Sequence, residues 1–250
     1  MSAQAPGAAS LPPMQALNVR LQFGGVVALN DVSLEIRDDE LLAIIGPNGA
    51  GKTTTFEMIV GFLHPDSGSI LLDDKELSGL PVWKRAREGL LYLPQEISLF
   101  NKLTVEENIY IILEEYYKDR REMEEVCHRY LKKVGLFDLR KHIAGTLSGG
   151  EKRRLEIGRS LTLNPKFFLL DEPFSGIDPK TVYELQDTIV ELKKDNIGIL
   201  LTDHNVRDAL RITDRAYLIH KGEILVEGTP SEILAHPDSR KVYFGEKFEI

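Results

Sequence analysis

The chain has 250 residues, carries a formal net charge of −8 and contains a single cysteine, Cys127. Its length suits one α/β domain with an inserted subdomain, and its acidic balance argues against nucleic acid as a partner. One cysteine excludes an internal disulfide, which fits a reducing compartment, and no apolar run approaches the roughly 20 residues that span a bilayer.

The first part of the chain predicts strands on either side of one helix. Residues 1–13 are rich in Ala, Pro and Ser, and we expect them to form a disordered leader. Alternating apolar and polar residues are typical of half-exposed strands, whereas a continuous apolar run indicates a buried one. On these grounds strands are predicted at Gln15–Phe23, Asp31–Ile36, Leu41–Ile45 and Ser69–Leu72, with a helix at Thr53–Phe62 and a polar turn at Asp73–Lys75.

The middle of the chain changes character. From Val105 to Val134 the sequence is charged and helix-like, with no strand signal, which predicts a mostly helical insertion. The strands around it have consecutive apolar residues, which favours parallel strands that are covered on both faces. The predicted strands are Leu90–Leu93, Phe167–Leu170 and Ile197–Leu201, followed by a hairpin of Ala216–Ile219 and Glu223–Glu227 around Lys221 and Gly222.

A glycine-rich segment follows the buried strand at Leu41–Ile45 and opens the predicted helix. It matches the phosphate-loop pattern G-x-x-x-x-G-K-[ST] in full, with the strand before and the helix after that this motif requires. Its glycines let successive backbone N–H groups point at phosphate oxygens, and the helix start adds its positive dipole end. We expect Lys52 to reach the β- and γ-phosphates and the Thr53 hydroxyl to bind Mg²⁺. The segment is Gly46-Pro47-Asn48-Gly49-Ala50-Gly51-Lys52-Thr53.

Chemically capable side chains follow three further predicted strands. The carboxyl ends of parallel strands share one edge of a sheet, and ligands bind there. One strand ends at Gln95, the next at Asp171 and Glu172, and the last at His204. Gln95 and Asp171 are candidate ligands of Mg²⁺. Glu172 could orient or deprotonate an attacking water, and His204 could contact the γ-phosphate.

A second anion site is predicted at the start of another helix. Ser148 is followed three residues later by Glu151, which is the capping-box pattern, and a helix-like run continues over Lys152–Leu163. Gly149 and Gly150 leave the backbone N–H groups at this helix start open to an anion. A capped helix without a ligand would show the same pattern, so the capping box alone leaves both interpretations open.

Six segments occur in the order seen in ABC ATPases, and the chain resembles that family over nearly all of its length after the leader. The resemblance implies an α/β fold: a P-loop NTPase (RecA-like) core with an N-terminal antiparallel β-subdomain and an inserted ABC-type α-helical subdomain. It implies one domain over 14–250, with core, β-subdomain and C-terminal tail in 14–95 and 160–250, and the helical insertion in 96–159. The six segments are the phosphate loop, Gln95, LSGGE at Leu147–Glu151, FFLLDE at Phe167–Glu172, SGID at Ser175–Asp178 and His204.

The same resemblance implies how ATP and Mg²⁺ are held. Each ATP would lie between the phosphate loop of one copy and the LSGGE segment of a second, so a homodimer around two ATP is expected. Phe23 stands where the family stacks an aromatic residue, often Tyr, on adenine, and Asp178 is expected at the dimer seam. The expected catalytic residues are Lys52, Glu172 and His204, and the expected metal ligands are Thr53, Gln95 and Asp171. The other expected nucleotide contacts are Gly46, Pro47, Asn48, Gly49, Ala50, Gly51, Thr54, Ser148, Gly149 and Gly150.

Finer resemblances point to a transport system. The stretches TTTFEMIVG, YLPQE, LTDHNVRD and VYFGEKFEI (53–61, 92–96, 201–208 and 242–250) are similar to ATPases of lipopolysaccharide export. FGGVVALNDVSLEI (23–36) is at least as similar to ATPases of branched-chain amino acid importers. The export interpretation implies a cytoplasmic protein on the inner membrane, beneath two transmembrane permease subunits, that drives lipopolysaccharide extraction.

Two interpretations from other classes remain. A non-transport ABC ATPase without a permease usually carries two ATPase halves or a long coiled-coil insertion, and this chain has neither. A nucleotide-binding scaffold without turnover is disfavoured by the intact Lys52, Glu172 and His204.

The expected cycle links the nucleotide to a membrane partner. ATP draws two copies together because each γ-phosphate satisfies donors from both chains, and hydrolysis loosens them. Closure would pass to the partner through a groove between the core and the helical insertion, lined by residues after Gln95. Leu93 and Phe100 are the candidates for an apolar socket that receives a short partner helix, and a core position is the alternative for Phe100.

Overall fold

The computed structural model describes residues 14–245. The leader predicted at 1–13 and the end of the tail at 246–250 lie outside these described residues.

A six-stranded sheet forms the centre of the molecule, with strand order β10-β9-β3-β8-β7-β6. Neighbouring strands from β9 to β6 run parallel, and only β10 pairs antiparallel, with β9. The predicted parallel strands and terminal hairpin are therefore confirmed, with ends shifted by at most one residue. The strands are β3 (Leu41–Ile45), β6 (Leu90–Leu93), β7 (Phe167–Asp171), β8 (Gly198–Thr202), β9 (Arg215–His220) and β10 (Glu223–Gly228).

A second, antiparallel sheet has the strand order β2-β1-β4-β5. Its strand β2 begins at Val26, five positions before the start predicted at Asp31, because the chain reverses at Gly24 and pairs Phe23 with Val26. Val26 and Val27 are adjacent apolar residues that are both exposed. This end of the strand therefore lacks the alternation of apolar and polar residues from which a half-exposed strand is predicted. The four strands are β1 (Met14–Phe23), β2 (Val26–Ile36), β4 (Ser67–Leu72) and β5 (Lys75–Glu76), the last of which begins inside the predicted turn.

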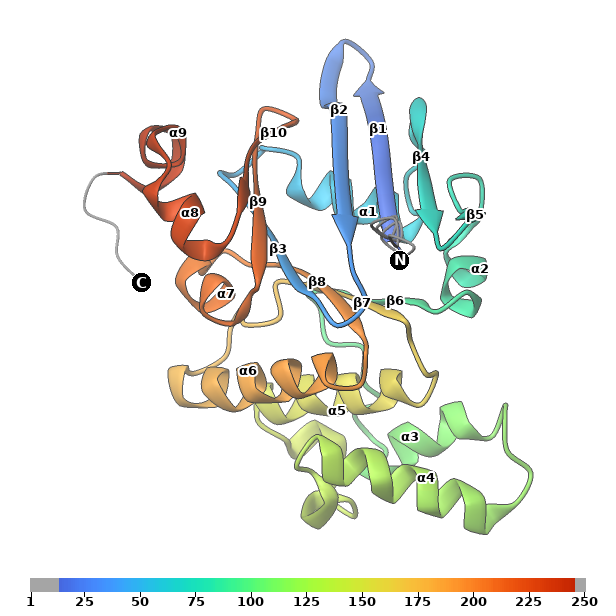
Figure 1. The fold of residues 1–250 in the computed structure, drawn as a ribbon. Helices are drawn as coiled ribbons and strands as arrows, with labels where there is room; N and C mark the ends of the chain where they lie inside the picture. The colour runs from blue at the N-terminus through green and yellow to red at the C-terminus, as the bar shows by residue number, and fades with distance from the viewer. Residues whose placement is uncertain (1–13, 246–250) are drawn as a thin grey trace, which may run out of the picture.

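The six-stranded sheet is covered on both faces, which explains why all five residues of β3 are buried. One face packs on helix α1 (Lys52–Val60) and the antiparallel sheet, and this cluster joins Leu42 of β3 to Phe56 of α1. The other face packs on the helices below it, where Leu41 shares a cluster with Leu155 and Leu185. Figure 1 shows these layers, with the antiparallel sheet above the central strands and α5 and α6 beneath them.

Helices α3 (Val105–Leu113), α4 (Arg120–Lys133) and α5 (Gly149–Leu161) follow β6, and α3 and α4 lie farthest from the two sheets (Figure 1). The helical insertion predicted at Val105–Val134 is thus helical but divided, because α3 ends at Leu113 and α4 begins at Arg120. A capping box of Thr104 and Glu107 fixes the start of α3. Short 3₁₀ turns at Phe137–Leu139 and Ala144–Thr146 lead on to α5.

The remaining helices were not predicted from periodicity. The short helix α2 carries the fully buried Arg85, whose guanidinium donates to the carbonyls of Met58 (2.8 Å) and Ile59 (2.7 Å) near the end of α1. These helices are α2 (Val82–Arg87), α6 (Pro179–Lys193), α7 (Val206–Ile212), α8 (Pro230–Ala235) and α9 (Pro237–Ser239), followed by a π-helical turn at Arg240–Phe244. Within the described residues, none of the helices is long and apolar enough to cross a membrane.

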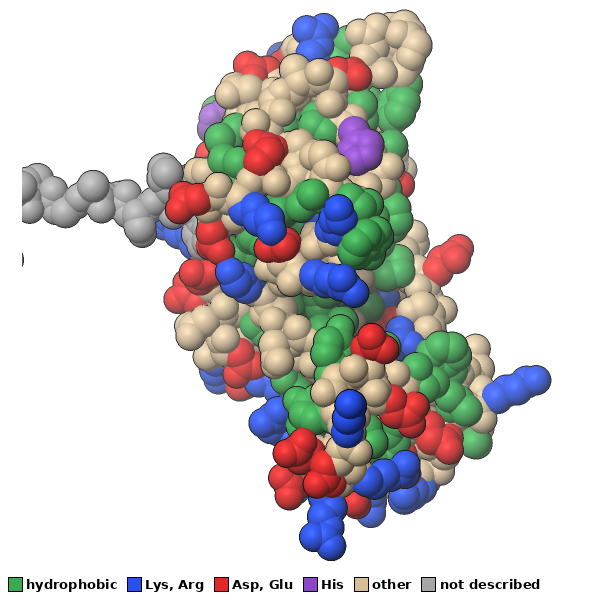
Figure 2. Space-filling model, turned by 90° about the vertical axis from the view of Figure 1, so that its right-hand side faces the viewer, with side chains coloured by type: hydrophobic (Ala, Val, Ile, Leu, Met, Phe, Trp, Pro, Cys, Tyr) green, Lys and Arg blue, Asp and Glu red, His purple; other side chains and the backbone are tan. Residues whose placement is uncertain are grey.

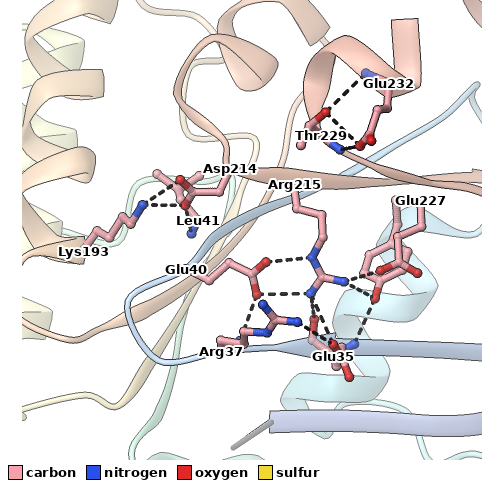
Figure 3. A network of polar contacts seen from close by, with 11 residues as sticks. Glu35, Arg37, Glu40, Leu41, Lys193, Asp214, Arg215, Glu227, Thr229 and Glu232 are labelled. Atoms are coloured by element: carbon pink, nitrogen blue, oxygen red, sulfur yellow. Dashed lines mark hydrogen bonds and ion pairs between the residues drawn. The ribbon is translucent and has the colours of Figure 1, made fainter. Parts of the chain in front are cut away.

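Arg215 at the start of β9 ties the two sheets together, as Figure 3 shows. Its guanidinium donates to both carboxylate oxygens of Glu40 (2.7 and 3.2 Å) and to the carbonyl of Glu35 on β2 (2.8 Å). Glu40 is nearly buried, so its charge depends on this partner. The network fixes the antiparallel sheet relative to the strands whose ends carry the candidate site.

Candidate active site

Three parallel strands bring their carboxyl ends to one cleft of about 700 Å³. Strand β3 leads into the phosphate loop, β7 ends at Asp171 and Glu172, and β8 leads to His204. The register places Asp171 of β7 opposite Thr202 of β8. The cleft is lined by Val26, Val27, Ala28, Asn48, Gly49, Gly51, Lys52, Thr53, Thr54, Glu172, His204, Lys221 and Gly222.

The phosphate loop needs glycine at two positions for space as well as for conformation. A Cβ on Gly46 would lie 2.2 Å from the carbonyl oxygen of Ile219, and a Cβ on Gly51 would lie 2.7 Å from a methyl carbon of Leu29. Gly51 has φ = 111° and stands at the cap of α1, so only glycine is comfortable there. The loop backbone therefore packs tightly against the core while its N–H groups at the helix start remain available to an anion.

Lys52 is 8% exposed and lies in this cleft. Its Nζ donates to the carbonyl oxygens of Gly46 (2.7 Å) and Pro47 (3.0 Å). Burial lowers the pKa of Lys52, while Glu172 and Asp171 act in the opposite direction. An ammonium group has three donors, and two carbonyls use two of them. A bound phosphate would satisfy the third and add the charge that a buried ammonium needs.

Asp171 is held by two hydroxyl groups. Its Oδ1 accepts a hydrogen bond from Thr202 Oγ1 (2.7 Å), and its Oδ2 accepts one from the Tyr92 hydroxyl (3.2 Å). Burial, and then Asp171 itself, raises the pKa of Tyr92, so this hydroxyl stays protonated as a donor. Each carboxylate oxygen retains a lone pair, and together with the Thr53 hydroxyl this set suits a hard, oxygen-binding cation such as Mg²⁺.

The described residues contain no group of three or more His, Cys, Asp or Glu side chains that could hold a metal ion by themselves.

Glu172 and His204 face each other across the cleft. Nε2 of His204 lies 2.7 Å from Oε1 of Glu172. The second carboxylate oxygen, Oε2, is buried without a hydrogen-bond partner among the described residues. Glu172 also has φ = 46°, a left-handed conformation that is unfavourable for a residue with a side chain. A carboxylate that is carried on a strained backbone and has one acceptor oxygen without a partner among the described residues is suited to act as a general base toward a water molecule.

Phe23 and Gln95 are predicted nucleotide contacts that do not line the cleft in this chain. Phe23 is 50% exposed at the end of β1, and its cross-strand neighbour Val26 is the residue that lines the cleft. Gln95 is exposed on the loop after β6 and is likewise absent from the lining. Pro47 and Ala50 contribute to the shape of the phosphate loop through their backbones, since the Ala50 N–H donates to the Pro47 carbonyl (3.2 Å).

The predicted second anion site lies on a different part of the surface. Ser148 and Glu151 form the capping box, since Ser148 N–H and Oγ each meet a Glu151 carboxylate oxygen at 2.8 Å. A Cβ on Gly150 would lie 1.9 Å from Thr181 Cγ2, so glycine is needed there for packing against α6. Asp178 caps α6 through Thr181 N–H (3.1 Å). Gly149, Gly150 and Asp178 do not line the cleft of the same chain.

A buried ion pair behind the cleft was missed by the sequence analysis. Arg153 and Glu156 are almost completely buried on α5, 3.1 Å apart. Arg153 also donates to the carbonyls of Pro94 (2.6 Å) and Asp171 (3.0 Å), and Glu156 accepts from Ser98 N–H (2.5 Å). Charged residues on a helix that otherwise reads as amphipathic were the available signal, but their partners are far away in the sequence. The pair ties the loop around Gln95 to the helix that begins at Ser148.

A second concavity of about 740 Å³ lies away from the cleft. It is lined by Trp83 and Arg87 of α2, by Tyr116 and Tyr117 after α3, and by Leu163 after α5, among others. Figure 2 shows this side of the molecule, where hydrophobic and basic side chains gather at mid-height, between the sheets and the helices below.

One of the two residues predicted to form an apolar socket for a partner, Leu93, was predicted wrongly. Leu93 is 2% exposed and belongs to the hydrophobic core, so it is not available to a partner, because β6 is an edge strand that α5 covers. Phe100 is 47% exposed, which rules out the alternative of a core aromatic. Ile97 on the same loop is also exposed.

Comparison with known proteins identifies consistent relatives. A family model described as "ABC transporter" matches residues 29–175. A probable ABC transporter ATP-binding protein of Azorhizobium caulinodans is 45% identical over 237 residues, which cover 95% of this chain and 84% of that protein. The lipopolysaccharide export system ATP-binding protein LptB is 44% identical in Acidithiobacillus ferridurans, over 95% of this chain and 98% of that protein. LptB of Escherichia coli K12 is 42% identical over 95% of this chain and 99% of that protein.

Solved structures give the same result for the fold. The ADP conformation of MJ1267, an ATP-binding cassette of an ABC transporter, superposes with a TM-score of 0.83 and 28% identity, over 94% of this chain and all of that one. The dimeric structure of a post-hydrolysis state of the ATP-binding cassette MJ0796, bound to ADP and Pi, has a TM-score of 0.74 and 27% identity, over 87% and 98% of the two chains. The predicted α/β fold, with its parallel core, antiparallel sheet and helical region, is therefore confirmed.

Proposed function

The chain belongs to the ABC transporter family as an ATP-binding protein that hydrolyses ATP, and from this premise we propose that it drives lipopolysaccharide export. In this proposal two copies close around two ATP molecules beneath a pair of transmembrane permease subunits, at the cytoplasmic face of an inner membrane. The main observation in support of this proposal is that one cleft is lined by Lys52, Glu172 and His204 in a chain 42% identical to E. coli LptB.

Binding rests on the phosphate loop. The backbone N–H groups from Gly49 to Thr53 and the ammonium of Lys52 would hold the triphosphate, while Val26, which lines the cleft, and its cross-strand neighbour Phe23 would meet the base. Thr53 and Asp171 would hold Mg²⁺, with Gln95 approaching only when its loop closes in. When bound, Mg²⁺ neutralises charge on the phosphate oxygens.

Hydrolysis rests on Glu172 and His204. A water oxygen attacks the γ-phosphorus, and the bond from that phosphorus to the bridging oxygen of ADP breaks. Glu172 takes the proton that the water gives up, through the oxygen that lacks a partner among the described residues. His204 holds the other oxygen at 2.7 Å and so keeps the carboxylate in place.

The proposed dimer accounts for residues that lie outside the cleft of their own chain. Gly149 and Gly150 present N–H groups at the start of α5, next to the capping residue Ser148, and this helix start would meet the γ-phosphate of the other copy. Asp178 would lie at the seam between the copies. MJ0796, which shares this fold, has a dimeric structure bound to ADP and Pi, and this supports the arrangement.

The permease is proposed to dock beside the loop that carries Gln95. Ile97 and Phe100 are exposed apolar side chains on that loop. The second concavity, which Trp83 and Tyr116 help to line, is proposed as part of the same docking face. Arg153 and Glu156 join the same loop to α5, so movement of the helical region (proposed as 96–159) and of the docking loop would be coupled. The relatives described above whose names state a transported molecule are lipopolysaccharide export proteins, and this favours export over amino acid import.

The test is reconstitution with membrane partners. The chain is assembled in lipid vesicles with the lipopolysaccharide-export permease pair of its own host and, separately, with a branched-chain amino acid permease pair. Assembly with the export pair alone, together with ATP-dependent release of lipopolysaccharide to an acceptor, is the expected result. Assembly and transport only with the amino acid pair would replace the export proposal, and absence of ATP hydrolysis in both would end it.

A further inference from the structure

We propose that Asp203 is a positioning residue for ATP hydrolysis, because it holds the loops of Glu172 and His204 in one fixed relation. The inference rests on the proposed ATPase function and adds a residue that touches neither the nucleotide nor the water. Asp203 directly precedes His204 and is 2% exposed.

The two oxygens of Asp203 bind two different loops. Oδ1 accepts a hydrogen bond from the N–H of Asn205 at 2.8 Å, on the segment that carries His204. Oδ2 accepts one from the N–H of Phe174 at 3.0 Å, on the segment that follows Glu172, and the two bonded residues are 29 positions apart. One carboxylate therefore joins the loop after β7, which carries Glu172, to the loop after β8, which carries His204.

A turn within the His204 loop would not by itself require a carboxylate at Asp203. The bond to Asn205 spans two residues and is the kind of turn that Asn or Ser also forms. Only a second acceptor oxygen reaches Phe174. Burial raises the pKa of Asp203 to about 6, with its two N–H bonds acting against it and the negative charges of Glu172 and Asp208 adding to the rise. A buried charge next to another acid is unfavourable, so its presence calls for a function.

The bond to Phe174 also restrains a strained residue. Glu172 has φ = 46°, which a side chain disfavours, and such a conformation persists only when its surroundings hold it. On one side, the N–H of Glu172 donates to the carbonyl of Thr202 at 2.9 Å. On the other side, Asp203 holds Phe174 two residues later. Loss of the second restraint would let Glu172 relax and draw its carboxylate away from His204.

The test is Asp203→Asn in the full chain. Asn has the same shape but only one acceptor oxygen, and its amide would face an N–H donor, so one of the two bonds is lost. We expect kcat for ATP hydrolysis to fall roughly 10- to 100-fold, as misplaced catalytic groups do. KM, and the affinity for a non-hydrolysable ATP analogue, should stay within about twofold of wild type. The thermal unfolding midpoint should not fall, because a buried charge has been removed.

Asp187→Asn is the control, since it makes the same change at an exposed position on α6, and it should keep the wild-type kcat. A wild-type kcat in Asp203→Asn overturns the inference, and so does a loss of affinity equal to the loss of rate. If Asp203→Asn does not fold, amide hydrogen exchange of the wild-type protein decides. Slow exchange at both Phe174 and Asn205 supports the link, whereas exchange at the rate of free loops overturns it.

The outcome is separable from that of the proposed function. A wild-type chain without ATPase activity, alone or with its permease, counts against the proposed function. A wild-type chain that hydrolyses ATP, beside an Asp203→Asn variant that does so equally well, counts only against the role of Asp203.

Discussion

Nε2 of His204 lies 2.7 Å from Oε1 of Glu172, although the two residues come from different strands and are joined to different loops. The contact satisfies one carboxylate oxygen of Glu172 and leaves the other, which is buried, without a partner among the described residues. A carboxylate that is oriented on one side and unsatisfied on the other is suited to accept a proton from water.

Glu172→Gln should retain ATP binding and lose turnover. The amide keeps the shape of the side chain but cannot take the proton, and removal of a general base costs about 10²- to 10⁴-fold in rate. The measurement is steady-state ATP hydrolysis, with size-exclusion chromatography in ATP to detect a trapped dimer. Glu125→Gln, an exposed position on α4, serves as the control. Normal turnover in Glu172→Gln would remove this residue from the role of base.

Lys52→Ala should weaken the binding of triphosphate. Loss of one charged hydrogen bond corresponds to about 1.5–3 kcal/mol, or roughly a 10- to 100-fold higher dissociation constant. Isothermal titration calorimetry with ATP and Mg²⁺ provides the measurement. Lys118→Ala, exposed on the loop after α3, should bind as wild type does. Equal affinity in Lys52→Ala and wild type would contradict the phosphate-loop assignment.

Phe100→Ala should spare the ATPase activity of the isolated chain and impair its assembly with the permease. Phe100 is 47% exposed and fills no space in the core, so its removal leaves the fold intact. An aromatic anchor at the centre of an interface contributes about 2 kcal/mol or more. Co-purification from detergent measures assembly, and Tyr183→Ala, an exposed aromatic on α6, is the comparison. Unchanged assembly would move the docking face elsewhere.

Arg215→Met should destabilise the fold, because it leaves the buried carboxylate of Glu40 without a cationic partner and with only the Arg37 N–H (3.0 Å) as a donor. Breaking a buried pair by removing one partner costs about 3–5 kcal/mol. Urea denaturation measures the loss, and Arg37→Met, whose side chain is 66% exposed in its ion pair, should change stability by less than about 1 kcal/mol. Adding Glu40→Gln to Arg215→Met should recover part of the stability. A double variant less stable than Arg215→Met would show that the buried charge of Glu40 is not the source of the loss.

Asp203 should make stability depend on pH in a predictable direction. Its folded pKa of about 6 lies above the usual value of 3.8, so the folded chain binds more protons than the unfolded chain between these pH values. The contribution of Asp203 to stability therefore falls as pH rises from about 4 to about 6, by up to about 3 kcal/mol, and is constant above that range. Asn does not titrate.

The check is the difference in unfolding free energy between Asp203→Asn and wild type, measured across this pH range. The difference should grow in favour of Asp203→Asn as pH rises to about 6 and then level off. The difference cancels the other carboxylates, which titrate in both proteins. A difference that is flat with pH would mean that burial does not raise the pKa of Asp203.

Much of the fold could be predicted because its strands are short apolar runs with clear ends. Strands β3, β6 and β7 begin where the sequence placed them and run parallel, so their carboxyl ends share one edge of the sheet, although Gln95 after β6 does not line the cleft. The start of β2 was missed because Val26 and Val27 face solvent, and α2 was missed because it is too short to show a period. Leu93 was misplaced because an apolar residue next to a functional loop can face either the core or a partner.

By itself the sequence determined the phosphate loop, the acidic pair after β7 and the capped helix start at Ser148. In each case the chemistry depends on residues next to one another in the chain, so their spacing carries the information. The tertiary structure alone decided which side chains meet across the sheet: His204 with Glu172, Asp203 with Phe174, and Arg153 with the loop around Gln95. These contacts depend on strand register and on packing between distant segments, and local spacing does not encode either of them.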